Sequence, residues 1–341
     1  MRGFTVVLAC FFSLPASAQW QQQFSGTDVQ LRGISAVSER NAWTSGAKGT
    51  VLRTIDGGEH WTKVDVPGAE ALDFRDIQAF DWDTAYVLSI GPGDQSRIYK
   101  TADGGKIWQR QFTNSDPKAF YDCFAFWDSK HGIALSDSVD GKFPLVATSD
   151  GATWTPVAVK SMPAALPNEG AFAASGTCIA TYGKNDVWFG TGGPAARVFH
   201  SADRGLTWTV AETPIIHGEA SQGIFSVAFL TRKDGVAVGG DYKDPEKTEG
   251  VAAFTHDGGR TWKLATHQPP GYRSGVDVVG HMFVAVGTNG VDSSNTGEGW
   301  HPLGKGNLNA ISFARLTAGW GAGPEGMIFR FNLLPPGLTD H

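Results

Sequence analysis

Aspartates recur along the sequence in a local pattern whose residue types could, taken alone, supply a catalytic acid or a metal ligand. The pattern is Ser or Thr, any residue, Asp, a short Gly-containing segment and Trp, as in TADGGKIW at 101–108. We call it the Asp box; its key positions are Asp56, Asp103, Asp150, Asp203 and Asp257, with Asn295 in a degenerate sixth copy. A calcium loop needs several oxygen ligands, whereas the box repeats a single carboxylate, so we expect no metal. Turn aspartates accept backbone N–H bonds and Gly permits positive φ, so the boxes are interpreted as structural.

A second set of residues could bind a ligand. Arg32, Arg75 and Arg273 stand at one apparent register in LRGI, FRDI and YRSGV, each at the start of a strand-like run. Clustered guanidinium groups would bind a carboxylate or another anion. Acidic and polar candidates predicted for the same rim are Asp122, Glu169, Glu219, Asp241 and Tyr242. In the alternative interpretation the arginines pair with local acids, for instance Arg75 with Asp76, and bind nothing.

An enzymatic function has weaker support from the sequence and remains an alternative prediction. A sialidase needs an Arg triad, a Tyr nucleophile assisted by Glu, and an Asp acid/base, and Tyr182 with Glu169 or Glu219 could rebuild part of that set. Asp122 with Glu169 could form a carboxylate pair for other glycosidase chemistry. The sequence contains no HExxH and no GxSxG motif, which leaves a binding function as the main prediction and a glycoside hydrolase as the alternative. No cofactor is expected.

The elements that position these residues follow from the repeat. The boxes recur at intervals of 38 to 54 residues, and each interval holds four short β-like runs with turn residues between them, which is typical of a propeller blade. After the sixth box, LNAISFA, AGWGAG and GMIFRF supply three further strands, and WQQQF (20–24) resembles the strands that follow the boxes. We therefore predict an all-β, seven-bladed propeller with four antiparallel strands per blade, the last blade closed by the N-terminal strand.

Loop lengths indicate which face binds. The turns between first and second strands are short, while five longer segments fall on the opposite face, at 91–97, 136–143, 160–175, 212–222 and 241–250. Long loops on a rigid scaffold are where binding residues concentrate, so the ligand is expected on the face away from the boxes.

The ends and the composition limit the compartment and the partners. Residues 1–18 read as a secretory signal peptide, which predicts an exported propeller over 19–337 and a tail over 338–341. The formal charge is −6 and no basic tract is present, so nucleic acid is not an expected partner, and no further segment is apolar enough to span a membrane. Cys123 and Cys178 are predicted to be two buried thiols, because neighbouring inner strands are expected to lie too far apart for a bridge; a disulfide is the alternative. A monomer is expected.

The box itself resembles the sialidase-type, or BNR, repeat, and GTVLRTIDGGEHW (49–61) resembles the photosystem II stability/assembly factor family. The resemblance extends over nearly the whole chain after residue 18. It implies an exported, non-enzymatic seven-bladed propeller that binds a protein, peptide or glycan. It also implies a periplasmic or extracellular location, or the thylakoid lumen in a photosynthetic host.

Overall fold

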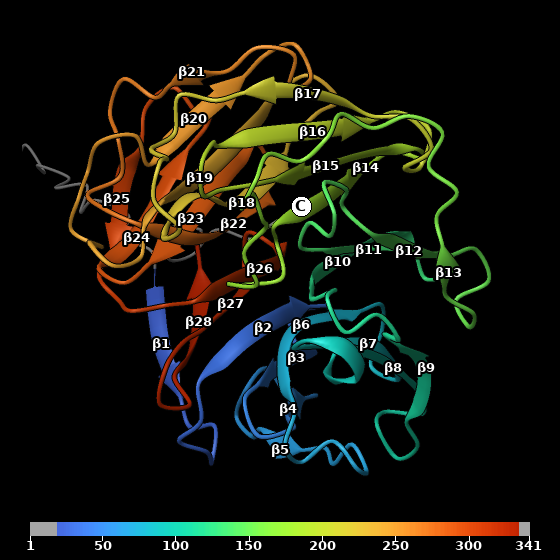
Figure 1. Ribbon diagram of the computed structural model, residues 1–341. Helices are drawn as coiled ribbons and strands as arrows, with labels where there is room; N and C mark the ends of the chain where they lie inside the picture. Colours follow the sequence, from blue (N-terminus) through green and yellow to red (C-terminus); the bar gives the residue numbers. More distant parts are fainter. Residues whose placement is uncertain (1–18, 334–341) are drawn as a thin grey trace, which may run out of the picture.

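A computed structural model describes residues 19–333 of the chain. Seven four-stranded antiparallel sheets surround a common axis (Figure 1), which confirms the predicted seven-bladed propeller. The expected signal peptide (1–18) and the last residues of the chain lie outside the described residues. Among the described residues, no helix is long and apolar enough to cross a membrane.

The blades follow one another in chain order, and each runs from an inner strand near the axis to an outer strand. Blades 1 to 4 comprise, in order, β2 (Leu31–Ala36), β3 (Ala42–Gly46), β4 (Thr50–Thr54), β5 (Thr62–Lys63); β6 (Asp73–Ala79), β7 (Thr84–Ile90), β8 (Arg97–Ala102), β9 (Gln109–Thr113); β10 (Tyr121–Asp128), β11 (His131–Ser136), β12 (Leu145–Thr148), β13 (Thr155–Pro156); β14 (Ile179–Tyr182), β15 (Asp186–Gly190), β16 (Arg197–Ser201), β17 (Thr209–Glu212). Blades 5 to 7 comprise β18 (Gln222–Phe229), β19 (Gly235–Asp241), β20 (Ala252–Thr255), β21 (Lys263–Leu264); β22 (Arg273–Val279), β23 (Met282–Gly287), β24 (Gly290–Ser294), β25 (His301–Gly304); β26 (Ala310–Arg315), β27 (Ala318–Ala322), β28 (Ile328–Asn332). A short 3₁₀ turn, η1 (Gly93–Gln95), precedes β8.

The ring closes through β1 (Gln19–Gln23), which forms the outer strand of blade 7 as predicted. It pairs antiparallel with β28, from Gln19 opposite Asn332 to Gln23 opposite Ile328 (Figure 1). The Gln23 side chain also joins blade 7 to blade 1: its Oε1 accepts the indole N–H of Trp320 at 3.2 Å and of Trp61 at 2.9 Å. Closure removes the exposed strand edge that an incomplete blade would present.

The blades form separate sheets, and polar bonds near the axis connect neighbouring inner strands. At five of the seven junctions, a Ser or Asp side chain of one inner strand accepts a backbone N–H of the next. These bonds are Ser35 to Ala79 (3.0 Å), Asp76 to Phe124 (2.7 Å), Ser226 to Val276 (2.9 Å), Asp277 to Phe313 (2.7 Å) and Ser312 to Ala36 (3.0 Å). We call them the inner-strand bonds; they satisfy donors that would otherwise be buried without partners.

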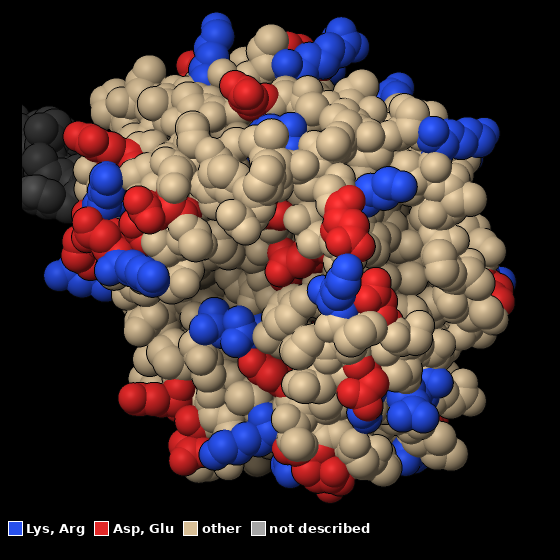
Figure 2. Space-filling view, in the orientation of Figure 1, with Lys and Arg blue, Asp and Glu red and all other residues tan. Residues whose placement is uncertain are grey.

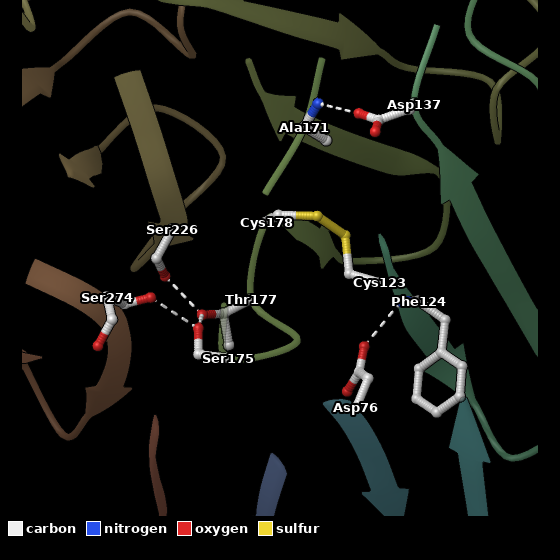
Figure 3. The surroundings of a disulfide bond; sticks show 10 residues. All are labelled: Asp76, Cys123, Phe124, Asp137, Ala171, Ser175, Thr177, Cys178, Ser226 and Ser274. Atoms are coloured by element: carbon white, nitrogen blue, oxygen red, sulfur yellow. Dashed lines mark hydrogen bonds between the residues drawn. A yellow bond between two sulfur atoms is a disulfide. The ribbon is translucent and has the colours of Figure 1, made fainter. Parts of the chain in front are cut away.

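The other two junctions use different groups. Between blades 4 and 5, the Thr177 hydroxyl lies 2.6 Å from the Ser226 hydroxyl (Figure 3). Between blades 3 and 4, the Thr181 hydroxyl donates to the carbonyl of Phe126 at 2.7 Å, and Cys123 is bonded to Cys178.

The Asp boxes occupy the turns between third and outer strands, at the ends of the blades away from the long loops. In the second box, Asp103 accepts the backbone N–H of Ile107 at 2.9 Å and the Thr101 hydroxyl at 2.9 Å. The hydrogen bond from the Ile107 N–H makes the largest contribution to lowering the pKa of Asp103. The Thr101 hydroxyl in turn accepts the N–H of Gly105, at a glycine whose φ of +86° few other residues adopt. The box is thus a self-contained turn in which Oδ1 of the Asp accepts both a backbone and a side-chain bond.

Removing the Gln23 side chain tests the closure. Gln23→Ala leaves two indole N–H groups without their acceptor, so we expect the free energy of unfolding to fall by about 2–4 kcal/mol. Gln22→Ala, at an exposed position of the same strand, is the matched control and should change it by less than about 0.5 kcal/mol. Urea unfolding measures both; equal small effects would show that the side-chain bridge contributes nothing to closure.

Burial of the inner-strand carboxylates predicts a pH dependence of stability. Burial raises the pKa of Asp277 to about 6. The folded protein therefore holds this proton more tightly than the unfolded chain, and Asp277 lowers stability as the pH rises from about 4 to about 6. Asp277→Asn removes this titration, so from pH 4 to pH 7 the stability of the variant relative to wild type should rise by up to about 3 kcal/mol.

Urea unfolding at several pH values measures that difference, with Asp65→Asn, an exposed aspartate, as the control for loss of one negative charge. A stability difference between Asp277→Asn and wild type that is constant from pH 4 to pH 7 would contradict the prediction.

Candidate functional site

A cavity of about 500 Å³ opens at the axis, on the face that carries the long loops. We call it the channel mouth. Figure 2 shows basic and acidic side chains on opposite sides of the hollow at the centre of the ring. The residues that line the channel mouth are Gln30, Arg32, Arg75, Phe172, Ala173, Ala174, Phe225, Tyr242, Tyr272, Ser274, Thr288, Asn307, Leu308, Asn309 and Pro324.

A repeated β-bulge determines which side chains reach the mouth. In five blades the pairing of inner and second strands skips one residue near the start of the inner strand, and that residue lies between two paired neighbours. A bulge redirects the extra side chain, and here it does so at equivalent positions around the axis. The skipped residues are Arg32, Arg75, Asp122, Phe225 and Ser274.

Arg32 and Arg75 are brought together at this mouth. Arg75 donates from Nη1 to the carbonyl of Ala173 at 2.9 Å and from Nε to Asp73 at 2.9 Å. Arg32 has one long bond, 3.4 Å from Nη1 to the carbonyl of Ala174, and its Nε has no partner. Burial and the neighbouring charge of Arg75 both lower the pKa of Arg32. The two cations therefore face one cavity with donor capacity in reserve, and the local pairing of Arg75 is with Asp73 and not Asp76.

Arg273 does not join them. Its side chain is fully buried, its Nε donates to Asp292 at 2.8 Å, and its Nη1 donates to Asn289 at 2.8 Å. The expected trio of arginines is corrected to a pair because the bulge of blade 6 falls one residue later, at Ser274. Arg273 is therefore directed away from the axis and belongs to an ion pair inside its blade.

The acidic candidates also separate. Glu169 is buried in blade 4, where it accepts Arg197 Nε at 2.8 Å and the Thr191 hydroxyl at 2.6 Å. Because its carboxylate is bonded to these groups, Glu169 has a structural role and does not lie on the rim as predicted. Glu219 lies exposed on the loop before β18 and does not line the mouth. Asp241 is mostly buried at the end of β19, where it accepts the side-chain amide of Gln222 at 3.0 Å.

Asp122 and Asp137 form the acidic side of the rim. They line a second cavity of about 340 Å³ that shares Arg75, Phe172 and Ala173 with the mouth. Asp122 is 1% exposed, and its Oδ2 has no hydrogen-bond partner. Burial, followed by the charge of Asp137, raises the pKa of Asp122 well above its usual range. We call this cavity the acidic pocket.

Aromatic residues that sequence reasoning missed line the remaining wall. Phe172 stacks on Phe225 with ring centres 3.8 Å apart, and Tyr272 meets Phe225 edge-on at 4.8 Å. Tyr242, which was predicted, is half-exposed and completes this wall at 6.2 Å from Phe225. The bulge signal could have found Phe225, since SVAF follows it as GISA follows Arg32; Phe172 lies on a loop and carried no such signal.

Cys123 and Cys178 form a disulfide between blades 3 and 4 (Figure 3), with Cα atoms 6.2 Å apart. This corrects the preference for two free thiols. Inner strands converge toward the axis, and at this radius the separation is within reach of a disulfide. The bond anchors the end of the long loop at 160–175, whose Ala173 and Ala174 carbonyls contact the arginines.

The residues that a sialidase-like site requires are not brought together. Tyr182 ends β14 at the turn between first and second strands, which lies on the Asp-box face, opposite the arginines. Glu169 and Arg273 are engaged in buried ion pairs. Among the described residues, one group could ligate a metal, Asp56 with Glu59 and His60, but it lies in the first box, where Asp56 already accepts the ring N–H of His60 at 2.8 Å.

Comparisons with known proteins agree with the repeat. A family model described as "Photosynthesis system II assembly factor YCF48" matches residues 13–115. A curated relative, photosystem II assembly protein Ycf48 of Synechococcus sp. (strain JA-2-3B'a(2-13)), is 25% identical over 297 residues, covering 72% of this chain and 78% of the relative. Vacuolar protein sorting/targeting protein 10 of Neosartorya fischeri is 32% identical over 126 residues, covering 33% of this chain and 8% of the relative's length.

Two solved structures share the fold. One, titled "YCF48 bound to D1 peptide", has a TM-score of 0.63 at 12% identity and covers 94% of this chain and 97% of the other. YCF48 from Cyanidioschyzon merolae has a TM-score of 0.60 at 17% identity and covers 92% and 98% of the two chains. The family model and the curated relative confirm the resemblance to the photosystem II assembly factor family that residues 49–61 indicated, and the two structures share the propeller fold.

The different environments of the arginines predict different effects on stability. Arg273→Ala leaves Asp292 charged and buried without a counter-ion, so we expect the free energy of unfolding to fall by about 3–5 kcal/mol. Arg32→Ala removes one long hydrogen bond and one like-charge contact, so we expect a change of less than about 1 kcal/mol. Urea unfolding of both variants measures this, and a large loss for Arg32→Ala would mean that its guanidinium is structural.

Proposed function

We propose that this propeller, which resembles the photosystem II assembly factors, binds an anionic segment of a partner protein at its channel mouth and acts without catalysis. One observation carries the proposal: Arg32 and Arg75 line one cavity, and within residues 19–333 Arg32 makes one long hydrogen bond, of 3.4 Å, and no ion pair. Holding two guanidinium groups together costs free energy that an anion between them would offset. A carboxylate or phosphate accepts from such donors in bidentate geometry.

The rest of the mouth suits a peptide. The rings of Phe225, Tyr242 and Tyr272 offer an apolar wall next to the charged pair. Aromatic side chains beside charged groups are frequent anchors in protein–protein recognition. The solved relative named as bound to D1 peptide has the same fold, which supports a peptide partner over a glycan.

The proposal also includes an exported location. We infer that residues 1–18 are a secretory leader, that 19–337 form the exported unit with a tail at 338–341, and that the unit acts as a monomer in the periplasm, the medium or a thylakoid lumen. The Cys123–Cys178 disulfide suits an oxidising compartment. Glycoside hydrolysis has less support, because Glu169 and Arg273 have their charges in use inside the blades.

Charge reversal at the mouth tests the function. Arg32→Glu with Arg75→Glu should abolish capture of the partner from a native extract, because both attractive charges become repulsive. The matched control is Lys106→Glu with Arg110→Glu, an equal change of charge at exposed positions near the outer strand β9. Mass spectrometry of the captured proteins measures the outcome, with circular dichroism to verify folding; identical partner lists for wild type and the mouth variant would refute the proposal.

A further inference from the structure

The acidic pocket next to the channel mouth has no role in binding an anion. Its lining comes from blades 2 to 5: Arg75, Phe120, Asp122, Asp137, Asn168, Gly170, Ala171, Phe172, Ala173, Gly192, Gly193 and Ala220. The titratable groups among them are two carboxyl groups, Asp122 on β10 and Asp137 directly after β11, and one guanidinium, Arg75 on β6. The pocket is thus predominantly acidic, whereas the mouth beside it is basic.

The carboxyl groups are held in place by the backbone. Asp137 accepts the N–H of Ala171 at 2.8 Å through Oδ1 (Figure 3), which leaves Oδ2 for another partner. Gly170 permits this position, since a Cβ there would lie 2.4 Å from Asp137 Oδ1. Behind it, the nearly inaccessible Asp122 has an oxygen without any hydrogen-bond partner. A buried polar group left unpaired costs free energy, and such exceptions call for an explanation.

The remaining walls fit a positive charge. Phe120 and Phe172 line the pocket, and aromatic faces attract cations. The small residues Gly192, Gly193 and Ala220 leave the volume of about 340 Å³ open. Arg75 stands at the border, but its guanidinium is already paired with Asp73 and with the carbonyl of Ala173, so its charge is partly compensated.

We propose that the acidic pocket is a binding site for an alkylammonium group, such as the side chain of a lysine in the bound segment, held by Asp137 with Asp122 behind it and by the two phenylalanine rings. The inference rests on the proposed function in one respect, since it adds a second specificity pocket to the same face. The partner segment then carries an anionic group and, within the span of two adjoining cavities, a lysine.

The pocket also implies that binding depends on pH. Burial raises the pKa of Asp137 to about 6, so at pH 5 this carboxyl is mostly protonated and at pH 7.5 mostly ionised. A cation binds the ionised form, and binding therefore releases a proton and strengthens as the pH rises through about 6.

Isothermal titration calorimetry with n-butylammonium tests the proposal, with n-butanol as the uncharged probe of equal length. Wild type should bind n-butylammonium about tenfold more tightly at pH 7.5 than at pH 5, and n-butanol not at all. Asp137→Asn keeps the bond to Ala171 and should weaken binding at pH 7.5 by tenfold or more. Asp140→Asn is the matched control: Asp140 is exposed on the same loop, pairs with Lys118, and should leave binding unchanged.

The outcomes separate this proposal from the proposed function. No n-butylammonium binding, equal binding of n-butanol, or unchanged binding by Asp137→Asn would overturn the acidic pocket. Asp137→Asn and the pH dependence of wild type decide the proposal; Asp122→Asn is not required, because the Asp122 carboxyl is nearly inaccessible. Partner capture that depends on Arg32 and Arg75 without n-butylammonium binding would overturn this inference alone, and the converse result would overturn the proposed function alone.

Discussion

The bond between neighbouring inner strands is the constraint on which this ring depends. Each blade completes its own backbone ladder, and the backbone bonds between described blades are isolated ones, such as that from the Ile224 N–H to the carbonyl of Thr191 at 3.1 Å. At five junctions a Ser or Asp side chain adds a bond between inner strands, because a backbone N–H withdrawn from water needs an acceptor. The bond fixes how one inner strand lies against the next, and it thereby fixes the backbone positions from which the channel mouth is built.

The binding face follows from that frame and from the bulges. One skipped residue per inner strand turns a side chain toward the axis in five blades, while the frame around it stays the same. The chemistry of this face is then set by residue type: Arg32, Arg75, Phe225 and Ser274 line the channel mouth, and Asp122 lines the adjoining acidic pocket. A scaffold of this kind can change ligand without changing fold, which is why the blade number says little about function.

Sequence patterns predicted the architecture better than the site. Six blades and their strand count followed from the boxes and their spacing, because each box marks one turn of one blade. The seventh blade and its closure by β1 followed from three strand-like runs after the sixth box and from the resemblance of WQQQF (20–24) to the strands that follow the boxes. The pairing of Arg32 with Arg75 followed from their matching flanks, but Arg273 did not, because a bulge moves register by one residue and leaves no obvious mark in YRSGV. The disulfide depends on a distance between blades, whereas the ion pair of Glu169 with Arg197 and the position of Phe172 depend on the path of the loop at 160–175. Neither a distance between blades nor the path of a loop produces a repeating pattern in the sequence.

Closure by β1 also determines when the ring can be completed as the chain folds. Residues 19–23 find their partners only at 328–332, almost the whole described length away, so the ring cannot be completed until the end of the chain is available. Contacts of such sequence separation form late and slow the overall rate of folding. During synthesis from the N-terminus, the ring therefore remains open until residues 328–332 are available. Until then blade 7 lacks its outer strand, whereas the other six blades contain all four of their own strands.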